Sequence, residues 1–184
     1  MIFGLFRSRD DQRQTLTLYG VIVAQARQPV FYSELGVPDT LEGRFEMLIL
    51  HAFLYLHRLK DEDEAAKEVA QKVFDAMFTD MDQSLREIGI GDLTVPKKIK
   101  KMAGAFYGRA AAYDAALVEG REALASAVQR NVYSDNSDER ANAEALSDYM
   151  IEAVNVLAGQ SKDDLTGKGP VFPQPKVPHN GSAA

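Results

Sequence analysis

Four lysines fall within five consecutive residues, in the stretch "VPKKIKKMAG", at Lys97, Lys98, Lys100 and Lys101. Ammonium groups at this density attract anions, such as an acidic protein, lipid head groups or RNA phosphates. Arg109 lies further along the same segment. The preceding glycines resemble those of a phosphate-binding loop, but the Walker spacing is absent. Two interpretations stay open: a solvated helix face, or a contact surface formed by the four lysines and Arg109.

The histidines and carboxylates do not form a recognisable catalytic or metal-binding motif. His51 and His57 are six residues apart, which places them on roughly opposite faces of one helix, so they cannot share a metal. No nucleophile motif occurs, and the carboxylates around residues 80–92 follow a helical pattern rather than that of a calcium loop. We therefore predict no catalytic residue, no metal ligand and no cofactor, and expect structural roles for the histidines.

Apolar residues recur at helical spacing along most of the chain. The expected helices cover residues 12–27, 39–59, 61–88, 94–119, 120–133 and 138–158, with Asp39 and Thr94 as N-caps and Gly120 dividing the fourth from the fifth. The helix at 39–59 is apolar on nearly every face, as a central helix must be. We predict an all-α fold: a flexible N-terminus at 1–11, a single compact bundle of about six helices at 12–159, and a disordered C-terminal tail at 160–184.

The segment that follows the lysines presents two distinct faces. An apolar stripe predicted to face the core comprises Ile99, Met102, Phe106, Ala110, Tyr113 and Leu117. A second face carries small residues, and the spacing of Gly104 and Gly108 predicts a close helix crossing. The flexible methionines that could contact a partner, or simply pack in the core, are Met47, Met77, Met81 and Met102.

Composition excludes several classes of protein. The net charge of −6 and pI near 5.1 argue against a general affinity for nucleic acid or for an anionic membrane. The chain has no cysteine, which excludes disulfides and thiolate sites. No window approaches the roughly 18 uncharged apolar residues of a membrane span, and the start lacks the pattern of a signal peptide. We therefore expect a cytoplasmic protein without a transmembrane segment.

Two sequence blocks resemble the ubiquinol–cytochrome c chaperone family, in particular its bacterial members. They are "GVPDT-x-x-GRFE" and "MD-x-x-LRE-x-G-x-GD", and the similarity covers roughly residues 16–133. The resemblance implies an all-helical, non-enzymatic assembly chaperone for the ubiquinol–cytochrome c reductase complex, whose partner is cytochrome b or its nascent chain. It also implies a cytoplasmic location, peripheral at the inner membrane, with the basic residues as the candidate contact for a ribosome or a membrane surface. Arg44 and His51 form a second candidate group for partner binding.

Two functions of other classes remain as alternatives. A helical small-molecule or haem-binding protein would line a pocket with His51 or with Tyr55, Phe106 and Tyr113. An enzyme would bring Asp80, Asp82 and Asp92 together in a concave polar site.

Overall fold

The computed structural model describes residues 3–176, with the side chains of residues 3–8 excepted. Within this range the chain forms eight α-helices and one 3-10 turn and contains no strand, so the all-α prediction is confirmed. The elements are α1 (Phe3–Ala26), α2 (Pro29–Ser33), α3 (Leu41–Leu59), α4 (Glu64–Glu87), α5 (Val95–Glu119), α6 (Arg121–Val132), η1 (Ser137–Glu139), α7 (Arg140–Ala158) and α8 (Lys162–Gly167). Six of the helices have 12 residues or more, in agreement with the predicted bundle of about six.

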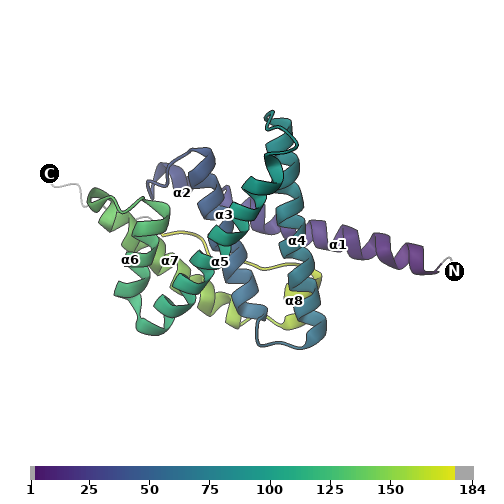
Figure 1. Ribbon diagram of the computed structural model, residues 1–184. Helices are drawn as coiled ribbons and strands as arrows, with labels where there is room; N and C mark the ends of the chain where they lie inside the picture. Colours follow the sequence, from purple (N-terminus) through teal and green to yellow (C-terminus); the bar gives the residue numbers. More distant parts are fainter. Residues whose placement is uncertain (1–2, 177–184) are drawn as a thin grey trace.

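Helix α3 is the centre of the bundle, as its apolar sequence predicted. It contacts α1, α4, α5, α6 and α7, and Figure 1 shows it in the middle of the molecule. Its fully buried side chains are Met47, Ile49, Leu50, His51, Tyr55 and Leu59. Because α3 has neighbours on all sides, its polar side chains must find partners inside the protein.

The start of α3 depends on a close approach between backbones. Thr40, not Asp39 as predicted, caps the helix, and its side chain accepts a hydrogen bond from the amide of Gly43 at 3.1 Å. Asp39 pairs instead with Arg44. A Cβ atom at Gly43 would lie 1.9 Å from the carbonyl oxygen of Pro38, so only glycine lets the connector cross the helix start.

Helices α4 and α5 form a hairpin whose connection, residues 88–94, we call the α4–α5 tip. In Figure 1 the tip projects beyond the rest of the bundle. Gly120, with φ of 114°, ends α5 and begins α6, so the predicted division of the helix there is confirmed. The four lysines follow the tip on the first turns of α5.

The small-residue face of α5 does not form the predicted helix crossing. A Cβ atom added at Gly104 or Gly108 would have no heavy atom within 4 Å, and both residues are exposed. Helices α3, α4 and α6 pack against other sides of α5. The sequence spacing defined the face correctly, but it could not tell whether another helix covers it.

The chain near the N-terminus is more regular than predicted. Helix α1 begins at Phe3 rather than near residue 12, and its first turns extend past α4 in Figure 1. Residues 3–11 therefore belong to the helix, because each added residue contributes one more backbone hydrogen bond once a helix exists. Residues 1–2 of the predicted flexible N-terminus lie outside the described range.

The predicted disordered tail is ordered between residues 160 and 176. Ser161 caps the short helix α8, and Leu165 is fully buried beneath it. The side-chain amide of Gln160 holds both the N–H and the carbonyl of Val171, at 2.9 and 2.8 Å, and Phe172 is buried against the core. Glycine, proline and polar residues dominate the composition of this segment, which led to the prediction of disorder. The composition did not reveal that Leu165 and Phe172 would anchor the segment to the core. Residues 177–184 lie outside the described range.

Candidate functional site

An apolar groove opens on the surface between α1, α3, α4 and the start of α5. Its apolar lining includes Val23, Leu41, Phe45, Met81, Ile88 and Met102, and its volume is about 220 Å³. Leu41 and Ile88 at its mouth are 64% and 62% exposed. A cavity of ~150 Å³ accommodates a benzene-sized group, so the groove has room for an apolar side chain from a partner.

The groove was not predicted from the sequence. Ile88, the last residue of the helix predicted at 61–88, lies at the C-cap of α4 and is mostly exposed. Of the four methionines considered as contacts, Met47, Met77 and Met81 are core residues and Met102 is partly buried; Met81 and Met102 also line the groove. The sequence did show an apolar residue, Ile88, at the end of a predicted helix. The periodicity of one helix does not show whether residues of other helices join it in a groove.

Two arginines border the groove on one side. Arg27 and Arg44 line both the groove and an adjoining polar hollow, which also includes Tyr32. Arg44 pairs with Asp39 at 2.6 Å on the surface, and Arg27 forms no ion pair with a described carboxylate. Arg44, predicted as a partner-binding residue, therefore lies where the apolar groove meets a cationic surface.

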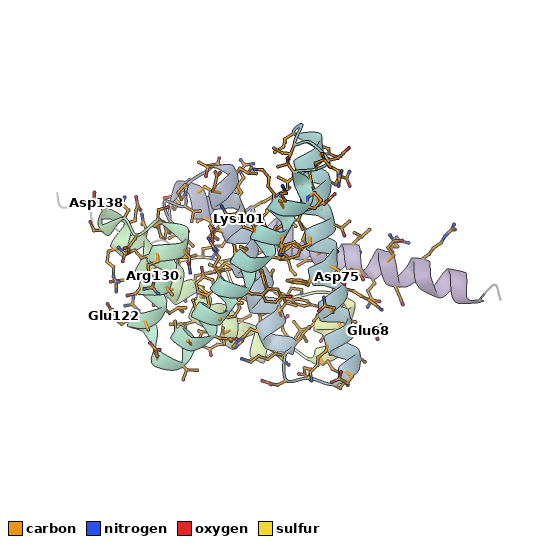
Figure 2. All side chains as sticks on the ribbon, viewed as in Figure 1. Glu68, Asp75, Lys101, Glu122, Arg130 and Asp138 are labelled. Carbon is orange, nitrogen blue, oxygen red and sulfur yellow. The ribbon has the colours of Figure 1, made fainter. Side chains whose placement is uncertain are left out.

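The four lysines are all exposed on the first turns of α5, and none forms an ion pair with a described carboxylate. Figure 2 labels Lys101, on α5 just below the tip. The first turn of α5 has no acidic residue, and Thr94 makes no side-chain capping bond. Cations at this end oppose the helix dipole, at a cost of ~0.3–1 kcal/mol each, and the structure shows no internal contact that offsets it.

Arg109, predicted to belong to the same contact surface, instead has a structural partner. Its guanidinium binds both carboxylate oxygens of Glu46 and also donates to the carbonyl of Ala105. The Glu46 side chain is 10% exposed and that of Arg109 24%. The pair joins α3 to α5. The sequence analysis did not foresee this partner, because Glu46 lies 63 residues away in the sequence.

His51, the other member of the second predicted group, is completely buried in a polar cluster. Its Nδ1 lies 2.8 Å from the carbonyl of Met47, which can only accept, so Nδ1 carries the proton. Its Nε2 then accepts from the hydroxyl of Tyr149 at 2.8 Å, and the Tyr149 oxygen accepts from Gln25 at 2.9 Å. Phe172 lies edge-to-face on the ring. His51 offers no free nitrogen to haem and no surface to a partner.

The buried cluster makes a specific pH dependence testable. Burial lowers the pKa of His51 from 6.5 to about 4. Because the unfolded chain binds the proton more tightly between these values, stability is expected to fall by about 3 kcal/mol as pH drops from 6.5 towards 4. A His51→Gln variant lacks this contribution. Urea unfolding between pH 7 and 4 should give a shallower loss for the variant, and equal losses would show that His51 does not titrate on unfolding.

The remaining titratable candidates do not converge on one site. Asp82 and Asp92 both pair with Arg86 on the exposed surface, whereas Asp80 accepts from the hydroxyl of Tyr19 at 2.8 Å. His57 lies 2.6 Å from Asp114. His179 is outside the described range. Among residues 3–176, no group of three or more histidine, cysteine or carboxylate side chains could hold a metal.

Tyr55 and Tyr113, proposed as pocket-lining residues for a bound small molecule, are core residues. Both are fully buried, and the hydroxyl of Tyr55 donates to the carbonyl of Leu165 at 3.3 Å. Phe106 packs against Phe74 with ring centroids 5.0 Å apart.

No helix in the described part of the chain is long and apolar enough to cross a bilayer.

Comparisons with known proteins place this fold among assembly factors. Residues 33–172 match the family described as ubiquinol–cytochrome c chaperone, so the match reaches beyond the residues expected from the sequence blocks, through α7 and α8. The Cbp3 homologue from Brucella abortus, known from a crystal structure, is 44% identical with a TM-score of 0.82, over 95% of this chain and 97% of that one.

Animal proteins are more distant relatives. Ubiquinol–cytochrome c reductase complex assembly factor 1 of Xenopus laevis is 28% identical over 88% of this chain and 81% of its own length. The human protein of that name is 25% identical over 90% of this chain but only 55% of its own length. Family match and structural similarity agree over most of the described residues, and the chain therefore belongs to the ubiquinol–cytochrome c chaperone family.

Proposed function

We propose that this chain is an assembly chaperone for the ubiquinol–cytochrome c reductase complex and that it binds cytochrome b, or its nascent chain, as its client. The proposal rests on the family and on the relatives, which are named as assembly factors of that complex. We place the protein in the cytoplasm, peripheral at the inner membrane, where a membrane-bound client would meet it.

The observation that carries the proposal is the apolar groove bordered by Arg27 and Arg44. A membrane protein exposes apolar side chains before insertion, and burying each large one contributes ~1.5–3 kcal/mol. The groove offers such burial without enclosing the client, because Leu41 and Ile88 lie at its open mouth. Arg27, which forms no ion pair with a described carboxylate, favours a client segment that carries a carboxylate beside its apolar residues. Met81 and Met102 add side chains that adapt to differing shapes.

We infer that the chain acts by binding and catalyses no reaction. A catalytic site needs polar groups that converge on a reacting atom. Asp82 and Asp92 form ion pairs with Arg86 on the surface, and Asp80 accepts a hydrogen bond from the hydroxyl of Tyr19. The polar network around His51 is internal and fully satisfied. These arrangements favour binding over catalysis.

The test is capture of the tagged protein from a membrane-rich extract of its own cell, followed by mass spectrometry, together with a deletion strain. We expect cytochrome b among the captured proteins, and reduced levels of assembled reductase in the deletion strain. Absence of cytochrome b combined with normal reductase assembly would contradict the proposed function.

The four lysines are proposed to contact the surface at which the client emerges, either a ribosome or a membrane. The exposed apolar side chains of the α4–α5 tip, which lie next to the lysines in the sequence, favour the membrane.

A further inference from the structure

The α4–α5 tip carries exposed apolar side chains, and the four lysines without a described ion-pair partner follow it directly on α5. Leu93, in the connection, is 90% exposed, and Ile88, at the C-cap of α4, is 62% exposed. The lysines follow on the first turns of α5, all of them exposed. Figure 1 shows this connection at the outermost end of the hairpin, clear of the neighbouring helices. A projecting surface of this kind can touch a planar partner before the rest of the molecule does.

The acidic residues close to the tip are already occupied. Asp92 accepts from Arg86 at 2.5 Å, and Arg86 also holds Asp82. Glu87 accepts from Gln83 at 2.8 Å. The lysines, in contrast, have no described carboxylate partner. The positive charge at the tip is therefore available to an external anion, and the helix dipole of α5 favours that anion at the same place.

We propose that the α4–α5 tip docks the protein on an anionic lipid surface, with Leu93 entering the interface and the four lysines against the head groups. Apolar residues beside basic residues are the combination that binds peripheral proteins to membranes. RNA fits less well, because single-stranded RNA is bound by aromatic side chains that stack on bases. Residues 88–101 contain no aromatic residue, and an exposed leucine contributes nothing to phosphate binding.

This inference deepens the proposed location at the membrane, but it can fail independently of client binding. The experiment uses the purified full chain and vesicles that contain no protein. Sedimentation is compared between vesicles of phosphatidylcholine alone and vesicles in which about a third of the lipid is phosphatidylglycerol, so that only the second kind carries a negative surface potential. We expect binding only to the anionic vesicles, and binding should weaken as salt is added.

Two variants separate the charge from the apolar contribution. Each lysine near an anionic surface contributes about a fivefold factor to partitioning, so glutamine at all four positions should lower the partition coefficient by about a hundredfold or more. Leu93→Ser should lower it by about tenfold or more, since one buried leucine is removed from the interface. Circular dichroism should show the same helix content in both variants.

Matched controls come from other exposed positions of the chain. Glutamine at Lys60, Lys67, Lys168 and Lys176 removes the same number of charges from other surfaces. Val118→Ser changes an apolar side chain that is 89% exposed at the far end of α5. Both controls should sediment like the wild type apart from the general effect of net charge. The proposal would be overturned if the control variants lost as much binding to the anionic vesicles as the tip variants do. The proposal would also be overturned if the wild-type protein did not sediment with the vesicles but bound a model RNA through the lysines.

Discussion

Replacing Arg109 with alanine is expected to lower the free energy of unfolding by about 4 kcal/mol at pH 7. The substitution leaves the Glu46 carboxylate, whose side chain is 10% exposed, without its guanidinium partner. Breaking one side of a buried ion pair costs ~3–5 kcal/mol, because the remaining charge stays desolvated. Urea unfolding followed by circular dichroism measures the change. The result would show that Arg109 belongs to the internal structure rather than to the contact surface.

The pH dependence of the Arg109→Ala variant identifies the cause of its instability. Burial raises the pKa of Glu46, and Arg109 opposes that rise. Without the arginine the folded state binds a proton at Glu46 more tightly than the unfolded chain does. The stability of the variant should therefore fall as pH rises above 4.5, the ordinary pKa of glutamate. The deficit relative to wild type should be largest near pH 7 and smallest near pH 4.

An exposed arginine provides the control for this experiment. Arg86 pairs with Asp82 and Asp92 on the surface. Arg86→Ala should cost less than about 1 kcal/mol, as exposed pairs usually do. If the Arg109 and Arg86 variants lost equal stability, and neither loss depended on pH, the structural role of the Glu46–Arg109 pair would be wrong.

Blocking the apolar groove is expected to weaken client binding by about thirtyfold or more. Leu41→Asp places a charge at the mouth of the groove, and Ser84→Arg puts a long side chain into it from α4. Both positions are exposed, so the fold should persist. Residues that anchor an interface contribute at least ~2 kcal/mol each. Fluorescence anisotropy with a labelled peptide copied from a membrane-spanning segment of cytochrome b measures the affinity.

Neighbouring positions supply matched controls for the two groove variants. Gln83→Arg introduces the same side chain one residue away, outside the groove lining. Leu16→Asp introduces the same charge at another exposed leucine, on α1. Both controls should bind the peptide like the wild type. If the controls weakened peptide binding as much as the groove variants, the effect would come from surface charge in general, and the groove would not be the client-binding site.

The groove and the α4–α5 tip lie next to each other. Ile88 belongs to the tip and also lines the groove. A protein docked by its tip would therefore hold the open end of the groove close to the lipid surface. A client segment could then leave the groove for the bilayer without an extended passage through water. The two proposals remain separable, because the lipid test uses Leu93 and the lysines, whereas the client test uses Leu41 and Ser84.

Helical periodicity predicted the fold well because it is a local property of the sequence. The buried stripe of α5, the apolar centre of α3 and the break at Gly120 all depend on residues within a few turns. The ordered segment after residue 160 was missed for a different reason. Leu165 and Phe172 anchor it to the core, but glycine, proline and polar residues dominate its composition.

The candidate site was less accessible to sequence reasoning because distant segments build it. The groove takes its lining from four helices, and no pattern within one helix assigns Leu41 and Ile88 to the same opening. Arg109 looked unpaired because Glu46 is on another helix. The exposure of the lysines was foreseen from their charge. The exposed apolar residues that accompany them were not.

The most direct test of the client proposal is site-specific photo-cross-linking in the living cell. A benzophenone amino acid replaces Leu41 in the groove and, in a parallel strain, Leu16 outside it. The account predicts an adduct with cytochrome b from position 41 and none from position 16. Failure of position 41 to reach cytochrome b while the reductase is being assembled, or equal adducts from both positions, would contradict it.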